Sequence, residues 1–308
     1  MIDLFNIENY TIDTSQFSNL LHDSIIKDFE DEFADYVGVK YACGVCSATA
    51  AIEIVTGYLR HPVQVPSIIP PVVLNALNHA KVFYSFVDNI EWVGNSYKLI
   101  NSSVRSVIDS AQRVEKNQYK KEAKNNDIII YSFYPTKPVG SIDGGMVVSD
   151  DLEFMTWFRQ AVHNGMELNH SSWLNQIGFP GWKAYLNSIQ AFIAQKNFRK
   201  LEDNKLILNE IRELYNELLG YNNTSDHLYR IKVQDNKTFI DKAKEKGITC
   251  GIHYKAMHKN TIYKKYQQQS LPLSELIENQ TVSLPFHVKL NRKNIEYICE
   301  TVNELCGK

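Results

Sequence analysis

Residues 131–137 read Tyr-Ser-Phe-Tyr-Pro-Thr-Lys, and residues 143–145 read Asp-Gly-Gly. The apolar run Ile128–Tyr131 that leads into this stretch has the composition of a strand buried on both faces, as in a parallel sheet. Lys137 follows that strand on a turn rich in Gly and Pro. Because open α/β sheets bind ligands at the carboxyl ends of their strands, we expect Lys137 to lie at a binding site.

A second apolar run, Val104–Ile108, ends in the sequence Asp-Ser-Ala-Gln at 109–112. A carboxylate at the end of a buried strand needs a partner, and a protonated pyridine nitrogen is one such partner. A lysine amine can hold an aldehyde as a Schiff base. Asp109 and Lys137 together therefore fit the requirements of pyridoxal phosphate (PLP), although Asp109 alone could simply cap a helix and Lys137 alone could be a surface lysine.

Small and hydroxylated residues at two positions indicate a phosphate site. Residues 46–51 read Cys-Ser-Ala-Thr-Ala-Ala between a predicted strand and a predicted helix, where backbone N–H groups and the helix dipole favour an anion. The alternative interpretation is an ordinary N-cap with small packing residues. Ser132, at the end of its strand, could donate a further hydrogen bond to the phosphate.

The composition excludes several classes of protein. The chain has 308 residues, of which 44% are hydrophobic and 22% charged, and its net charge of −2 gives no footprint for nucleic acid. It contains no apolar run long enough to span a membrane, and its acidic N-terminus does not resemble a signal peptide. Cys43 and Cys46 form a single C-x-x-C without a second pair, which does not favour a metal or redox role. We therefore expect a reduced, cytoplasmic protein without a metal.

Hydrophobic periodicity predicts strands alternating with helices, followed by a smaller α+β unit. Helices are expected at 15–37, 47–58, 71–77, 185–219, 237–246 and 291–305, and strands at 41–46, 63–69, 81–87, 104–108, 128–131, 146–149 and 248–254, with a further strand from Tyr229. This order predicts a mostly parallel, doubly wound major domain at 1–220 and a C-terminal minor domain at 221–308.

Together these motifs resemble the DegT/DnrJ/EryC1/StrS family of PLP-dependent sugar aminotransferases, which have the aspartate-aminotransferase fold (PLP fold type I). The resemblance extends from about Phe29 to the C-terminus. The family patterns and their places in this chain are S-G-T-A-A at 47–51, D-A-A-Q at 109–112, S-F-Y-P-T-K at 132–137, Q-A at 190–191, H-Y at 253–254 and S-L-P at 283–285. The S-F-Y-P-T-K match is complete, and this version is common in enzymes that act on 3-keto sugars.

The resemblance implies a role for each matched residue. Lys137 would bind PLP covalently and then act as the acid and base that moves the proton. The implied PLP contacts are Asp109 to the pyridine nitrogen, Gln112 to the phenolic oxygen, and Ala48, Thr49 and Ser132 to the phosphate. Lys183 stands where the family has an asparagine that reaches the phosphate of the partner subunit, which implies a homodimer with shared sites.

The resemblance also implies the substrates. Glutamate is the expected amino donor, and a nucleotide-linked keto sugar, a 3-keto or 4-keto 6-deoxyhexose, is the expected acceptor. Tyr134, Tyr185, His253 and Tyr254 are expected to contact it. Tyr185 occupies the position of an arginine in the family pattern, so that position offers no bidentate carboxylate clamp.

Two departures leave a second interpretation open. The aromatic residue that stacks on the PLP ring should follow Ser67, but Ile68 and Ile69 stand there. Only residues 89–108 separate Asp88 from Asp109, so about one βα unit is missing. These departures favour a degenerate, non-catalytic PLP-fold protein that serves as a binding partner, whereas the retained Asp109, Gln112, Ser132 and Lys137 favour an enzyme.

Overall fold

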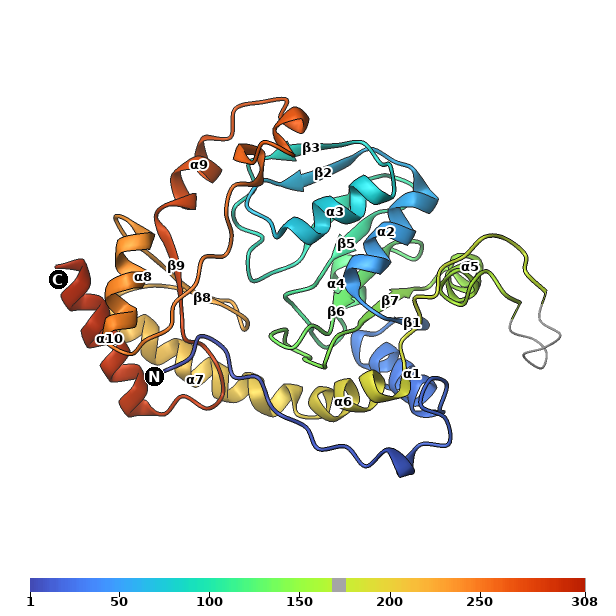
Figure 1. Cartoon of the computed structure of the whole chain (residues 1–308), viewed down its shortest axis with the longest axis horizontal. Coiled ribbons are helices and arrows are strands. Elements are labelled where there is room, and N and C mark those ends of the chain that lie inside the picture. Colours follow the sequence, from blue (N-terminus) through green and yellow to red (C-terminus); the bar gives the residue numbers. More distant parts are fainter. Residues whose placement is uncertain (168–175, 308) are drawn as a thin grey trace.

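The computed structural model describes residues 1–167 and 176–307. A central five-stranded sheet has the strand order β1-β7-β6-β5-β4, with the bounds Tyr41–Val45, Gly145–Ser149, Ile128–Ser132, Val107–Asp109 and Tyr97–Ile100. Figure 1 labels β1, β5, β6 and β7 in the middle of the molecule. Strand β7 is antiparallel to β1 and β6, β6 is parallel to β5, and β4 is antiparallel to β5. Strands β1, β5 and β6 therefore run in one direction, and the predicted α/β class is confirmed.

Helices cover both faces of this sheet. The alternation of side chains along β6 sends Ile128 and Ile130 into one core and Ile129 and Tyr131 into another. The first core also contains residues of α2 (Ala48–Leu59), α3 (Pro71–His79) and α5 (Leu152–Val162), together with the parallel pair β2 (Val63–Pro66) and β3 (Tyr84–Val87). The second core contains residues of α1 (Ile25–Val37), α4 (Gln118–Glu122) and α6 (Ser188–Phe198).

A third core lies in the C-terminal part of the chain. It joins α7 (Leu201–Leu219) and the antiparallel pair of β8 (Tyr229–Lys232) and β9 (Thr281–Leu284) to α8 (Asn236–Glu245) and α10 (Arg292–Cys306). Helix α9 (Pro272–Glu278) and three short 3₁₀ turns (Thr14–Gln16, Met257–Lys259 and Lys264–Tyr266) complete the regular structure of the described residues. Helix α7 lies before the predicted boundary at residue 220, yet it contributes to this C-terminal core. The division into 1–220 and 221–308 stays a prediction.

Three sequence-based elements are corrected by the structure. The helix expected at 15–37 begins only at Ile25, because the side chains of Asn19 and Asp23 accept hydrogen bonds from nearby backbone N–H groups and hold a turn there. The helix expected at 185–219 begins at Ser188, where Asn187 and Gln190 form a capping box, and is divided in two around residues 199 and 200.

The strand expected at 248–254 is the third correction. This segment makes only isolated bridges, from Ile248 to Ile2 and from Gly251 to Ser283. The strands expected at 63–69, 81–87 and 104–108 are shorter or displaced, at Val63–Pro66, Tyr84–Val87 and Val107–Asp109. Strand β4 was not predicted, and it lies within the short segment that separates Asp88 from Asp109.

Within residues 1–167 and 176–307, no helix combines the length and the apolar composition that a membrane span requires.

Candidate active site

The ends of two neighbouring strands bring the central residues of the site together. Strands β5 and β6 pair in parallel with Asp109 opposite Ile130, so that Asp109 and Ser132 lie at the same edge of the sheet. The chain then turns, with the backbone N–H of Lys137 donating to the carbonyl oxygen of Tyr134 at 2.9 Å. This turn returns Lys137 towards Asp109, close enough for the two charges to interact.

Burial adjusts the protonation of both charged groups. Burial lowers the pKa of Lys137 to about 8, against the opposing effect of the Asp109 carboxylate. Burial also raises the pKa of Asp109, against hydrogen bonds from the Ala111 N–H (3.0 Å) and the Tyr97 hydroxyl (2.9 Å). A lysine with a pKa near 8 is neutral in a useful fraction of molecules near neutral pH, which is what attack on a carbonyl requires.

Gln112 is held by groups from two other segments. Its Oε1 accepts a hydrogen bond from the Gly94 N–H at 2.6 Å, and its Nε2 donates to the Tyr254 hydroxyl at 2.9 Å. An amide has two N–H donors, and these contacts leave one for a further acceptor. The structure thus brings Tyr254, predicted as a substrate contact, to the same cluster as Asp109 and Gln112.

The start of helix α2 presents unpaired backbone donors. The Ser47 hydroxyl caps the helix by accepting from the Ala50 N–H at 3.2 Å, whereas the N–H groups of Ala48 and Thr49 belong to the first turn and have no intrahelical acceptor. Gly145 makes this close approach possible, because a Cβ there would lie 2.9 Å from the Ala48 nitrogen. The buried Ser132 hydroxyl accepts from the Tyr134 N–H at 3.3 Å and keeps its own proton free to donate.

A cavity of about 340 Å³ opens beside Lys137. Thr136, Lys137 and Gln112 line one side of it, and Ser225, His227 and His287 line the other. Burial and the charge of Lys137 keep the pKa of His227 well below its usual value, so His227 is neutral. The cavity therefore joins the sheet edge to the C-terminal part of the chain.

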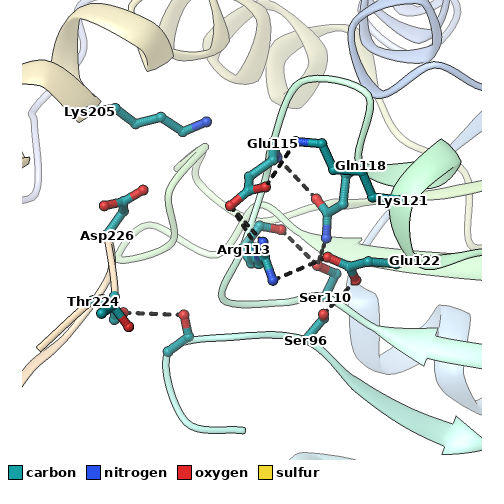
Figure 2. A network of polar contacts seen from close by, with 12 residues as sticks. Ser96, Ser110, Arg113, Glu115, Gln118, Lys121, Glu122, Lys205, Thr224 and Asp226 are labelled. Atoms are coloured by element: carbon teal, nitrogen blue, oxygen red, sulfur yellow. Dashed lines mark hydrogen bonds and ion pairs between the residues drawn. The ribbon is translucent and has the colours of Figure 1, made fainter.

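A polar network fixes the loop between Asp109 and α4. Figure 2 shows it, with Arg113 at its centre and Ser96, Glu115 and Glu122 around it. Its contacts are Gln118 to Ser110 (2.8 Å), the Glu115 N–H to Gln118 (3.0 Å), Arg113 to Glu115 (2.9 Å), Arg113 to Glu122 (3.3 Å) and Ser96 to Glu122 (2.6 Å). Four of these contacts fix the residues on either side of Gln112 against one another, and the contact of Ser96 with Glu122 ties this loop to the segment that precedes β4.

Of the predicted site residues, only Gln112 and Lys137 line this cavity. Three of the others have quite different surroundings. Tyr134 is 54% exposed, Lys183 is exposed, and Tyr185 packs its ring against His22 and His163, with ring centroids 4.6 and 5.1 Å away. His253 lies closer to the cluster and shares a hydrogen bond of 2.8 Å between its Nδ1 and the Ser283 hydroxyl. The roles predicted for Tyr134, Tyr185, His253 and Lys183 stay predictions.

Two aromatic residues of the site were missed by the sequence analysis. Tyr97 is buried opposite Asp109 in the antiparallel register of β4 and β5, and its hydroxyl donates to the carboxylate. Trp92 stacks on Tyr254, with ring centroids 5.9 Å apart and planes 10° apart, and its indole N–H donates to the Ile68 carbonyl at 2.9 Å. Trp92 thus places an aromatic ring beside Ile68, although it comes from a later segment of the chain. The one sequence signal that could have indicated this is a tryptophan within a polar stretch.

These residues fit PLP. The Asp109 carboxylate has lone pairs left after its two hydrogen bonds, Gln112 has a remaining N–H, and the start of α2 offers backbone N–H groups that Gly145 leaves uncovered. Lys137 supplies an amine with a lowered pKa. The cofactor-binding residues predicted by the resemblance are therefore compatible with the group, and their individual roles are proposals.

Replacing Tyr97 with Phe should destabilise the cofactor-free protein, because it leaves the buried Asp109 carboxylate one donor short. We expect the free energy of unfolding in urea to fall by about 1–3 kcal/mol. Tyr84→Phe is the control, since within the described part of the chain that buried hydroxyl accepts one hydrogen bond, from the neutral Asn78 amide at 3.2 Å. In an Asp109→Asn background the effect of Tyr97→Phe should shrink, and an equal loss in both backgrounds would show that the two side chains are not coupled.

The fold and the sequence both match known aminotransferases. A solved sugar aminotransferase, Spr1654 of Streptococcus pneumoniae in its PMP form, superposes with a TM-score of 0.82 at 17% identity, over 98% of this chain and 97% of that one. Helicobacter pylori PseC, an aminotransferase of pseudoaminic acid biosynthesis, gives a TM-score of 0.78 at 20% identity over 98% and 99% of the two chains. The predicted PLP fold type I is therefore confirmed.

Curated relatives agree over almost the whole chain. A UDP-4-amino-4,6-dideoxy-N-acetyl-beta-L-altrosamine transaminase of Campylobacter jejuni is 24% identical, with 98% of this chain and 96% of the relative covered. A dTDP-3-amino-3,6-dideoxy-alpha-D-galactopyranose transaminase of Aneurinibacillus thermoaerophilus is 25% identical, with 90% and 89% covered. The model of the DegT/DnrJ/EryC1/StrS aminotransferase family matches residues 6–62 and 102–303. The chain thus belongs to the DegT/DnrJ/EryC1/StrS family, which confirms the expected aminotransferase class and its PLP cofactor.

Proposed function

We propose that the protein is a PLP-dependent aminotransferase that transfers an amino group from glutamate to a nucleotide-linked keto sugar. The observation that carries the proposal is Lys137, whose pKa burial lowers to about 8, beside the buried carboxylate of Asp109 at the edge of the sheet. A degenerate binding protein has no need of a reactive lysine next to an unneutralised buried carboxylate, so the non-catalytic alternative is disfavoured.

Each residue of the cluster has a proposed task. When bound, PLP supplies an electron sink that stabilises negative charge at the reacting carbon. Asp109 holds a negative charge against the pyridine nitrogen, and Gln112 orients the ring oxygen. Ala48, Thr49 and Ser132 bind the phosphate. Lys137 would hold the cofactor through its amine, and the same amine would serve as the acid and base that moves the proton.

The acceptor is proposed from the relatives. Two of them act on UDP-linked and dTDP-linked amino sugars, with the amino group at carbon 4 in one and at carbon 3 in the other. A third is named as a spore coat polysaccharide biosynthesis protein of Bacillus subtilis. We infer a 3-keto or 4-keto 6-deoxyhexose as the acceptor and a role in making amino sugars for polysaccharides, with the hydroxyls of Tyr134, Tyr185 and Tyr254 and the imidazole of His253 as contacts.

We further infer that the active unit is a homodimer with shared sites. Lys183 is exposed and lies outside the Lys137 cavity of its own chain, which is compatible with a contact to the phosphate in the partner subunit. Its ammonium would place a positive charge where the family has a neutral amide.

The first test measures covalent capture of PLP by the cofactor-free protein as a function of pH. Only the neutral amine reacts, so the rate should rise with pH and reach half of its maximum near pH 8, as the pKa of Lys137 requires. Because the Asp109 charge raises that pKa, Asp109→Asn should shift the curve to lower pH. Borohydride reduction and peptide mass mapping then locate the adduct. Nα-acetyl-lysine, which keeps a free side-chain amine, is the control that shows how protonation of PLP itself changes the rate with pH. An adduct on another lysine would refute the assignment.

The second test is a half-reaction screen. The protein is loaded with pyridoxamine phosphate, and dTDP- and UDP-linked 3-keto and 4-keto 6-deoxy sugars are added one at a time. We expect one of them to restore the absorbance of the PLP form. A rapid reaction with an ordinary α-keto acid and none with the sugars would instead identify an amino-acid transaminase.

The third test addresses the shared site. Lys137→Ala and Lys183→Ala chains should each lack most activity, and a dissociated and reassociated mixture should recover part of it, because one site in each hybrid dimer is intact. Trp182→Ala, at the neighbouring exposed position, is the control for damage to the loop. Light scattering that shows an active monomer, or a mixture that recovers nothing, would contradict the shared-site model.

A further inference from the structure

An arginine on β8, Arg230, has a side chain that pairs with none of the described residues. Tyr229 and Ile231 of this strand are buried in the third core, and because side chains alternate along a strand, Arg230 points to the opposite face. Its side chain is partly buried. Among the described residues its guanidinium makes no hydrogen bond and no ion pair, whereas its backbone carbonyl accepts a hydrogen bond from the Asn223 side chain at 3.0 Å.

The surroundings of Arg230 compensate its charge only in part. Burial lowers the pKa of the guanidinium, against the opposing effects of Glu91 and Tyr254; Glu91 is exposed and forms no ion pair with Arg230. An arginine stays charged under these conditions, so a partly buried and unpaired guanidinium is unfavourable unless an anion binds there. This points to a ligand rather than to a role in stability.

A short series of contacts connects Arg230 to the centre of the site. Arg230 is the cross-strand partner of Ser283, whose hydroxyl shares a 2.8 Å hydrogen bond with His253. The next residue, Tyr254, contacts Gln112 at 2.9 Å. The positive charge of Arg230 is close enough to help lower the pKa of His253, after the larger effects of burial and Lys137. Arg230 therefore lies on the side of the cluster that faces the C-terminal part of the chain.

We propose that Arg230 binds the α-carboxylate of the amino donor, an inference that rests on the proposed aminotransferase function. The planar fork of a guanidinium matches a carboxylate with two parallel hydrogen bonds. In an α-amino acid the carboxylate is one bond from the carbon that loses the amine, whereas the diphosphate of a nucleotide sugar is separated from the carbonyl by the sugar ring. The proximity of Arg230 to the Gln112 cluster thus favours the donor carboxylate.

This assignment also accounts for the missing arginine of the family pattern. Tyr185 stands at that position and packs against His22 and His163, so no guanidinium acts from there. Arg230 supplies one from a different strand and from the other part of the chain. The preference of the enzyme for an amino donor that carries a carboxylate would then depend on β8.

The experiment compares Arg230→Gln and Arg230→Lys with Lys232→Gln, which removes an exposed charge two residues along the same face of β8. The PLP form is mixed with glutamate, and the pyridoxamine form with the keto sugar found in the half-reaction screen, each followed by absorbance. Calorimetry of glutarate, an unreactive dicarboxylate, gives affinity without turnover, and thermal unfolding confirms that each variant is folded.

We expect Arg230→Gln to weaken glutarate binding and the glutamate half-reaction at least tenfold, with little change in the sugar half-reaction. Arg230→Lys should give an intermediate loss, because the charge remains without the fork, and Lys232→Gln should match the parent protein. Unchanged glutarate affinity in Arg230→Gln, or a loss confined to the sugar half-reaction, overturns the proposal. If the parent protein itself fails to react with glutamate, the proposed function fails instead.

Discussion

The burial of the Asp109 carboxylate is the constraint on which the rest of the site depends. Asp109 ends a three-residue strand inside the sheet and is 4% exposed, so its charge must be compensated by the protein or by a ligand. The protein supplies two hydrogen bonds and a nearby lysine, which is not enough to return the pKa of Asp109 to its ordinary value. A pyridinium ring would add the missing positive partner. Burial at the edge of the sheet therefore has two consequences: it favours a positively charged ligand beside Asp109, and it lowers the pKa of Lys137.

Local contacts take the place of the βα unit that is missing between Asp88 and Asp109. Strand β4 fills the sheet position next to β5 by running antiparallel, which needs only a tight connection instead of a crossover helix. This reversal places Tyr97 opposite Asp109 and brings Gly94 to Gln112. The family model leaves residues 63–101 unmatched, and this interval contains β2, α3, β3 and β4. The groups that support Asp109 and Gln112 from this side thus lie in the part of the chain that the family model does not match.

The C-terminal part of the chain is attached firmly to the same region. The Met257 N–H donates to the Ser67 carbonyl at 2.9 Å, and His258 shares a buried hydrogen bond of 2.5 Å with the Ser67 hydroxyl. Further along, the Ser274 N–H and hydroxyl both donate to the Asp88 carboxylate, at 2.7 and 2.6 Å. These contacts tie the segments that follow Tyr254 to Ser67 and Asp88, near the central sheet. Residues of the central sheet and of the C-terminal part of the chain therefore lie around one site.

The sequence by itself determined the parts of the protein that rest on local patterns. The apolar run before Ser132, the strand-to-helix turn at 47–51 and the placement of Asp109 and Lys137 after buried strands depend on nearest neighbours, and they identified the fold class, the family and the cofactor. Only the tertiary structure decided the contacts between distant segments. The pairing of Tyr97 with Asp109, the stacking of Trp92 on Tyr254 and the unpaired state of Arg230 arise from strand register and from packing across 12 to more than 100 positions of the sequence, which no local periodicity encodes. The same reason explains the helix start at Ile25, because the side-chain hydrogen bonds of Asn19 and Asp23 overrode a helical pattern of apolar residues.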